Sequence, residues 1–327
     1  MVEGLSRSFW KPRKPSEDAG WWRRLFPGRE RSTVIRDLTF SIGEGEFVGY
    51  VGPNGSGKST TIKCLTGVLV PTAGTVRCLG LVPWRDRLEY TARIGVMFGQ
   101  KSLLFWELPV RDALEVYREI YAVGQADFAR WLERFDAIFG VGRLLDRRVY
   151  SLSLGERMRC EIAASFLHHP RLVFLDEPTI GLDADARDAM RQLLQELHRR
   201  DGVTVMLTTH QMEDIETLCT RIIVLGDGRI RFDGGPAELR RQYLPVKCLR
   251  VSFSRIRSPE RFEAALARCR VVESGFDFRR LEVPAAVEIA AFTSELLQSL
   301  DVIDLEMNDP DLDQVMRIAY AEEPRAE

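Results

Sequence analysis

A glycine-rich loop sets the architecture of this chain, and it reads Gly52-Pro53-Asn54-Gly55-Ser56-Gly57-Lys58-Ser59-Thr60. It matches the phosphate-loop pattern G-x-x-x-x-G-K-[ST] at every fixed position. The glycines let the backbone wrap closely around a polyphosphate and point successive N–H groups at it. The helix expected after the loop turns the positive end of its dipole toward the same anion. The loop therefore predicts a site for the phosphates of a nucleoside triphosphate.

The segments on either side of the loop supply the context that this pattern requires. Residues 46–51 predict a short buried strand, and residues 59–68 predict a helix. Lys58 offers a mobile positive charge to the outer phosphates, and the Ser59 hydroxyl is placed to ligate Mg²⁺. The alternative is a glycine-rich turn that only opens a helix. Strand, loop, Lys-Ser pair and helix in this order favour nucleotide binding.

Composition indicates a folded protein of about two domains. The chain has 327 residues, 45% of them hydrophobic and 29% charged. A net charge of −2 and a pI of about 6.2 leave no general basic field, which argues against bulk nucleic-acid binding. The cysteines are scattered without a C-x-x-C pair, which favours a reducing compartment over a disulfide framework or structural zinc.

The hydropathy of the chain bears on its location. The sequence has no run of about 20 apolar residues, the length that a membrane span needs. Its first residues also lack the apolar region of a secretion signal. We therefore expect a cytoplasmic protein that is peripheral to a membrane only through a partner.

Polar side chains follow four predicted strands at the points where the strands end. Besides the phosphate loop, they are Gln100 after residues 93–98, Asp176 and Glu177 after an apolar run, and His210 after residues 203–208. Ligands bind outside the carboxyl ends of the strands in an open α/β sheet. A lone histidine is usually a loop residue of no special role, but coincidence is a poor account of four such ends. The polar residues at these four strand ends predict a single site at one edge of the sheet.

The rest of the chain divides into a helical insertion and a second domain. Apolar residues at helical spacing over residues 110–145 and a helix over 154–168 indicate a helical subdomain, about 101–168, mounted on an α/β core. The first domain is expected to span 1–244. Residues 245–327 read strand, helix, strand, strand, helix, strand and a last helix, which suits a small ferredoxin-like α+β domain. This part carries no phosphate loop, so we expect it to be regulatory or interaction-forming.

With these residues assembled, residues 2–240 resemble the ATP-binding subunit of an ABC transporter, of the exporter type with a separately encoded permease. The most specific segment is Leu152-Ser153-Leu154-Gly155-Glu156-Arg157, which is similar to the family signature LSGGQ. The wording Asp176-Glu177-Pro178-Thr179-Ile180-Gly181-Leu182-Asp183 is typical of the same group. The resemblance implies a phosphate-loop ABC-type ATPase core with an inserted helical subdomain.

The resemblance also implies a role for each polar position. Gly52 to Thr60 would hold the phosphates of ATP, and Ser59, Gln100 and Asp176 would organise Mg²⁺ and the attacking water. Glu177 would be the general base, steadied by His210. Ser153, Gly155 and Glu156 would complete the site of the opposite subunit, with Asp183 linking the two sites. Phe9 is the candidate to stack on adenine, and Trp10 is the alternative.

Two departures from the signature are visible. Leu154 stands where the first glycine usually does, and Glu156 stands where glutamine does. Ser153 and Gly155, whose hydroxyl and close-approaching backbone would touch phosphate, are kept. We therefore expect an active enzyme with altered dimer affinity.

The partners implied are an integral-membrane permease and a second ATPase subunit, identical or nearly so, with no nucleic acid. An ABC-type ATPase acting on ribosomes or DNA is the alternative; the single phosphate loop and the absence of heptads and of a basic tail argue against it. A nucleotide switch or small-molecule kinase would not explain the signature. The transported substrate is chosen by the permease.

Two apolar segments leave alternatives open. Leu103-Leu104-Phe105-Trp106, just after Gln100, is expected either to dock the permease or to cap the core of the helical subdomain. The N-terminal insertion, about 11–31, contains Trp21-Trp22-Arg23-Arg24-Leu25-Phe26. This segment is either an interfacial element at a membrane or a surface insertion packed on its own domain.

Overall fold

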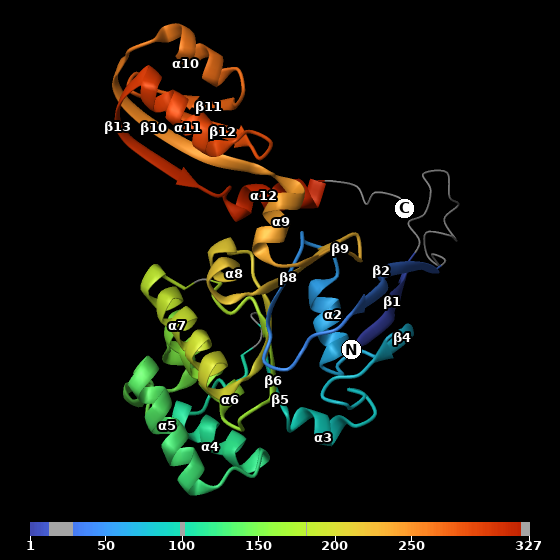
Figure 1. The fold of residues 1–327 in the computed structure, drawn as a ribbon. Helices are drawn as coiled ribbons and strands as arrows, with labels where there is room; N and C mark the ends of the chain where they lie inside the picture. Colours follow the sequence, from blue (N-terminus) through green and yellow to red (C-terminus); the bar gives the residue numbers. More distant parts are fainter. Residues whose placement is uncertain (13–28, 99–101, 181, 322–327) are drawn as a thin grey trace, which may run out of the picture. The chain divides into compact units, whose positions relative to one another are not determined.

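A computed structural model of this chain describes residues 1–12, 29–98, 102–180 and 182–321. It contains two compact units, Met1–Asp233 and Gly234–Glu327 (Figure 1). The division lies earlier than the expected one after residue 244. Helix α9 (Pro236–Tyr243) belongs to the second unit because it packs against α12 (Leu312–Ala321), and Arg240 Nε donates to Pro310 O at 2.9 Å.

The first unit is built on a six-stranded sheet in the order β5-β6-β7-β3-β8-β9. The strands are β3 (Phe47–Val51), β5 (Ile94–Phe98), β6 (Leu172–Asp176), β7 (Thr204–Thr208), β8 (Arg221–Gly226) and β9 (Arg229–Gly234). All pairs from β5 to β8 are parallel. Every residue of β3 and β7 is buried, as expected for strands covered on both faces. The carboxyl ends of the parallel strands therefore meet at one edge.

A three-stranded antiparallel sheet in the order β2-β1-β4 lies beside this core. Its strands are β1 (Val2–Pro12), β2 (Arg29–Phe40) and β4 (Ala73–Val76). Leu5, Ile35, Tyr50 and Ile62 share one buried cluster, which joins the two sheets through helix α2 (Lys58–Leu65).

The ladder between β1 and β2 runs as far as the pair Pro12–Arg29. Residues 11, 12 and 29–31, which were expected in the insertion, therefore belong to the strands. Their pairing was not predicted because the backbone hydrogen bonds of a ladder need no alternating side-chain pattern. The tryptophan-rich part of the insertion lies outside the described residues.

Helices α4 (Val110–Ile120), α5 (Gln125–Phe139) and α6 (Leu154–Phe166) come between β5 and β6 in the chain and gather at one end of this unit, in green in Figure 1. Short 3-10 turns at Gly142–Leu144 and Val149–Ser151 connect α5 to α6. In α5, the buried rings of Phe128, Trp131, Phe135 and Phe139 contact one another in series, because residues three or four apart share a helix face.

The remaining helices of the unit are α3 (Arg87–Thr91), α7 (Ala184–Asp201) and α8 (Met212–Leu218). Helices α3 and α8 were not predicted from the sequence. Among the residues that the structure describes, no helix combines the length and the apolar character needed to cross a membrane.

The second unit contains β10 (Val246–Ile256), α10 (Pro259–Leu266), β11 (Arg270–Ser274), β12 (Phe278–Pro284), α11 (Ile289–Ser299), β13 (Leu300–Asn308) and α12. Its strands form an antiparallel sheet in the order β11-β12-β10-β13. A core that includes Leu249, Phe253, Phe262, Leu281 and Phe292 joins the sheet to α10 and α11. The unit therefore has a hydrophobic core of its own.

Candidate active site

The phosphate loop connects β3 to α2 in a conformation that its glycines make possible. Gly55 and Gly57 have φ angles of +84° and +108°, where other residues are strained. A Cβ on Gly52 would lie 2.6 Å from the Ser56 Oγ. Lys58 Nζ donates to Gly52 O at 2.6 Å, so the lysine folds back over the loop. The loop is thus compact, and its shape depends on residues without side chains.

This loop presents polar groups that its own chain does not satisfy. Ser56 Oγ is buried and has no hydrogen-bond partner among the described residues. Helix α2 begins at Lys58 with no side-chain cap, which leaves the first N–H groups of the helix available to a ligand. Burial lowers the pKa of the Lys58 amine, an effect that Glu177 and Asp176 partly oppose. Unpaired donors around a lysine fit a bound polyphosphate.

Strand β6 ends in two carboxylates whose surroundings differ. Asp176 Oδ1 accepts a hydrogen bond from Thr208 Oγ1 at 2.5 Å, on the neighbouring strand β7. Glu177 has a φ of 57°, a left-handed conformation that is uncommon for a residue with a Cβ. Its amide donates to Thr208 O at 2.9 Å. Strand β7 therefore holds both residues and keeps Glu177 in a strained backbone turn.

The Glu177 carboxylate meets His210 at the end of β7. His210 Nε2 lies 3.3 Å from Glu177 Oε1, and the His210 amide donates to Glu177 Oε2 at 3.3 Å. Burial raises the pKa of Glu177, while the charges of His210 and Lys58 partly oppose this rise. A carboxylate with a raised pKa is better suited to accept a proton than an exposed one. The geometry suits a general base oriented by a histidine.

The signature segment begins helix α6. Ser153 caps this helix: its Oγ accepts from Glu156 N at 3.2 Å, and Glu156 Oε2 accepts from Ser153 N at 2.8 Å. Arg147 pairs with Glu156 at 2.8 Å. The Ser153 amide and then Arg147 lower the pKa of Glu156. This capping box explains why an acid is tolerated where the family pattern has glutamine.

Comparison with known proteins identifies this arrangement. The family model described as "ABC transporter" matches residues 35–180. The Nod factor export ATP-binding protein I of Paraburkholderia xenovorans is 36% identical over 208 residues, which are 63% of this chain and 67% of that protein. This chain belongs to the ABC transporter ATP-binding family.

Other relatives agree with this assignment. The ABC transporter ATP-binding protein NatA of Bacillus subtilis is 29% identical over 217 residues, 66% of this chain and 88% of that protein. A solved ATP-binding subunit of an ABC transporter superposes with a TM-score of 0.62 at 27% identity and covers 74% of this chain and 92% of its own. A dimeric ATP-binding cassette in a post-hydrolysis state, bound to ADP and Pi, gives a TM-score of 0.59 at 25% identity, covering 72% and 97%. The α/β ABC ATPase fold, ATP binding and ATPase activity are therefore confirmed.

In this ABC ATPase, the other predicted site residues lie on three elements. Asp183 caps α7, with Oδ1 accepting from Ala186 N at 2.8 Å. Phe9 on β1 is half-buried under the Arg7 guanidinium, 4.7 Å from its ring centre, while Trp10 is 68% exposed. Ser59, in the first turn of α2, is exposed. Gln100 lies outside the described residues.

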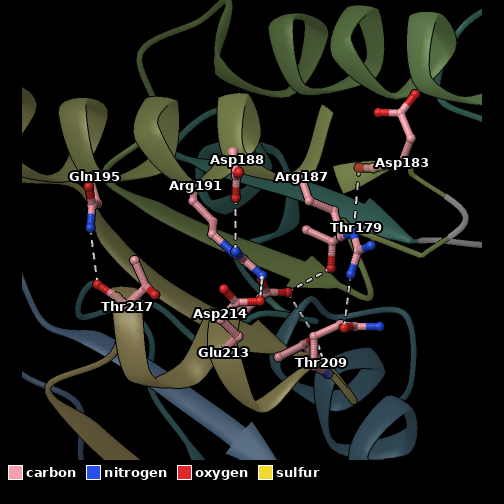
Figure 2. A network of polar contacts seen from close by, with 11 residues as sticks. Thr179, Asp183, Arg187, Asp188, Arg191, Gln195, Thr209, Glu213, Asp214 and Thr217 are labelled. Atoms are coloured by element: carbon pink, nitrogen blue, oxygen red, sulfur yellow. Dashed lines mark hydrogen bonds and ion pairs between the residues drawn. The ribbon is translucent and has the colours of Figure 1, made fainter. Parts of the chain in front are cut away.

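One buried group beside the ABC site, Asp214 on α8, was not predicted from the sequence. This residue is fully buried, and Figure 2 shows it at the centre of a polar network with Thr179, Arg191 and Thr209. Met212, Ile215 and Leu218 at helical spacing were a signal for the helix. Nothing local in the sequence shows that its aspartate turns inward.

Proposed function

We propose that this chain is the motor subunit of an ABC exporter, which pairs with a second ATPase subunit on ATP and drives transport through a separate membrane permease. The observation that supports it best is the Glu177–His210 contact at the sheet edge that also carries the phosphate loop. Export is supported by the relatives whose names include Nod factor export. This function places the subunit peripherally, on the cytoplasmic face of a membrane.

Hydrolysis then follows from the positions of the side chains. Gly52 to Thr60 bind the phosphates, and Lys58 exchanges its backbone acceptors for phosphate oxygens. Glu177 orients the attacking water and accepts its proton. His210 holds the Glu177 carboxylate from the next strand. The protein contributes mainly positioning and charge compensation, as phosphoryl transfer requires.

The residues present also fit a magnesium ion. Asp176 is a carboxylate fixed by Thr208, and the exposed Ser59 hydroxyl begins the neighbouring helix. Asp176, Ser59 and Gln100 would hold Mg²⁺, which supplies positive charge near the phosphates when bound.

The signature segment is proposed to act on the site of the opposite subunit. Ser153 is exposed and Leu154 is 39% exposed, although both begin a helix of the folded unit. A Cβ on Gly155 would meet Leu182 Cδ2 at 3.6 Å, an ordinary contact, so packing within the chain does not require glycine here. A close approach by another molecule does give a reason for glycine. Asp183, at the start of α7, would link the two sites.

Docking to the permease is proposed for the exposed part of the apolar segment after Gln100. Leu104 is buried, whereas Phe105 and Trp106 are 43% and 49% exposed. The Trp106 ring lies 5.5 Å from the Arg157 guanidinium, which is on the signature helix. Leu104 thus serves the core, and Phe105 and Trp106 offer an apolar contact to a partner.

For the second unit we propose a ferredoxin-like domain with a regulatory or interaction role. Its order of elements and its antiparallel strand order support this assignment. The residues proposed for ATP chemistry all lie in the first unit.

The test is Glu177→Gln, which keeps the size of the side chain and removes the base. We expect ATP binding to persist and turnover to fall by about 100-fold or more. ATP should then hold two subunits together, seen as a dimer by size-exclusion chromatography with ATP and Mg²⁺. Lys58→Ala is the control that should weaken ATP binding itself. Normal turnover by Glu177→Gln would remove Glu177 from this role.

A further inference from the structure

The buried polar network of Figure 2 connects three parts of the site that are distant in sequence. We call Asp214, Arg191, Thr179 and Thr209 the Asp214 cluster. We propose that Asp214 is a positioning residue that sets the Glu177–His210 contact and ties it to helix α7. This inference rests on the proposed function, since it assumes that Glu177 is the base and His210 its support.

One carboxylate oxygen holds the two loops that carry these residues. Thr179 follows Glu177 by two residues, and Thr209 directly precedes His210. Both hydroxyls donate to Asp214 Oδ2, Thr179 at 2.7 Å and Thr209 at 3.1 Å. Shifting Asp214 would therefore move both loops together. The 3.3 Å distance between His210 Nε2 and Glu177 Oε1 depends on how far apart these two loops lie.

The second oxygen of Asp214 is fixed by an arginine. Arg191 Nε donates to Asp214 Oδ1 at 2.6 Å, and the side chains of the two residues are 8% and 0% exposed. Burial alone would lower the pKa of Arg191, but the hydrogen bonds that Arg191 donates to Asp214 and Glu213 outweigh this effect and raise the pKa. With three donors on two oxygens, the carboxylate cannot rotate freely. An aspartate held in this way is a rigid anchor.

Helix α7 is linked to the residues that directly precede and follow His210 in the sequence. Arg191 contacts Thr209 through Asp214, and Arg187 Nη1 donates to Gln211 Oε1 at 3.2 Å. Both arginines belong to the helix that Asp183 caps. Since Asp183 is proposed to face the opposite subunit, the cluster gives a physical connection between that interface and the pair that handles the water.

The alternative is that the cluster only stabilises the packing of α7 on α8. The two roles differ in what a single hydroxyl does. A stability role predicts lower thermal stability with unchanged turnover of the folded enzyme. A positioning role predicts a lower kcat with an unchanged KM for ATP, since the phosphate loop is not touched.

The experiment measures kcat and KM for ATP, with the melting temperature, in Thr209→Val, Thr179→Val and Asp214→Asn. We expect kcat to fall on the order of tenfold in each, with KM within about twofold of the wild type. Thr209→Ser keeps the hydroxyl and should restore kcat. Glu213→Ala is the matched control: it removes a 69% exposed partner of Arg191 next to Asp214 and should leave both constants unchanged. If Asp214→Asn fails to fold, the threonine variants decide.

A double-mutant cycle separates positioning from stability. In a His210→Ala background, Thr209→Val should add little further loss, because its effect passes through the histidine. Additive losses, an unchanged kcat in folded Thr209→Val, or equal losses in Thr209→Val and Thr209→Ser would overturn the inference. Glu177→Gln is assayed in parallel. If it is inactive while the cluster variants are normal, only this inference fails; if it is fully active, the proposed function fails as well.

Discussion

Glu177 carries backbone strain at the point where the chemistry is proposed. Its left-handed conformation, with φ of 57°, costs about 1–3 kcal/mol for a residue with a Cβ. The turn persists because Thr208 binds its amide and also the preceding carboxylate of Asp176. The strain directs neighbouring carboxylates to different partners, Asp176 to Thr208 and Glu177 to His210.

Gly155 is a position where we expect one substitution to affect stability and activity in opposite directions. It lies in the first turn of α6, and the nearest atom to a Cβ there, Leu182 Cδ2, would be 3.6 Å away, an ordinary contact. Because alanine favours a helix over glycine by about 0.5–1 kcal/mol, we expect Gly155→Ala to raise the free energy of unfolding slightly. Turnover should nevertheless fall on the order of tenfold, because in the proposed dimer the opposite subunit approaches this glycine closely and an added methyl group would hold it away.

Thermal unfolding of the isolated subunit and steady-state ATPase assays check these opposite directions. Ser165→Ala, a change on the buried face of the same helix, serves as the comparison for a substitution away from the interface. A Gly155→Ala enzyme with normal turnover would show that nothing approaches this position closely.

Glu161 provides a test based on pH. The residue is 2% exposed, and its Oε1 lies 3.5 Å from Arg157 Nε. Burial raises the pKa of Glu161 in the folded chain above its ordinary value near 4.5, against smaller opposing effects of Ser102 and Arg157. A carboxyl whose pKa is raised on folding contributes stability below the unfolded pKa and loses it as the pH rises through the folded pKa.

We therefore expect Glu161→Gln to be more stable than the wild type at pH 8 and to lose this advantage toward pH 4.5. Denaturant titrations at pH 5 and pH 8 measure the free energy of unfolding in each case. If glutamine destabilises the protein at pH 8, the attraction of Arg157 outweighs the cost of burial and folding does not raise the pKa of Glu161.

At the scale of elements, the sequence predicted what local patterns encode. The phosphate loop, β6 and β7 each carry a contiguous signal, a motif or an apolar run that ends in polar residues. Helix α8 has only seven residues, so its periodicity is short, and it was missed. The partners of Asp214 lie 35 residues away at Thr179 and 23 at Arg191. Such contacts depend on the packed sheet and leave no trace in one sequence.

The apolar segment after Gln100 was expected to be either docking surface or core, and in the structure Leu104 is buried while Phe105 and Trp106 are partly exposed. We expect Phe105→Ala combined with Trp106→Ala to keep the melting temperature and basal ATPase of the isolated subunit. Co-purification with the permease should weaken, because an aromatic anchor at an interface contributes about 2 kcal/mol or more. Phe105 and Trp106 are 43% and 49% exposed, so few core contacts are lost.

Leu104→Ala is the matched control for this pair. Leu104 is 3% exposed, so its truncation should destabilise the subunit by about 2–5 kcal/mol. A Phe105/Trp106 double variant that unfolds as easily as Leu104→Ala, but binds the permease normally once folded, would assign the whole segment to the core.

At the scale of the whole molecule, the boundary between the units shows what a sequence pattern can hide. The first domain was expected to end at residue 244, directly before Pro245. The structure places α9 with the second unit, since α9 packs on α12 and Arg240 binds Pro310, 70 residues further on. A proline after a helix marks where the helix ends, not which core it belongs to.

This assignment of α9 predicts which of two shortened chains is the more soluble and the more resistant to aggregation. A chain ending at Gly235 keeps β9 complete and contains all the residues proposed for ATP chemistry, so it should hydrolyse ATP at a rate within about threefold of the full chain.

A chain ending at Leu244 also carries α9 but lacks α12. Leu239, fully buried in the full chain, then loses the cover that α12 provides to its helix. We expect the longer fragment to be less soluble and to aggregate at a lower temperature, because it exposes apolar surface. Size-exclusion chromatography, thermal unfolding and ATPase rate per folded molecule measure these differences. If the chain ending at Gly235 folds but does not bind ATP, or if the chain ending at Leu244 is the better behaved, α9 belongs to the first unit after all.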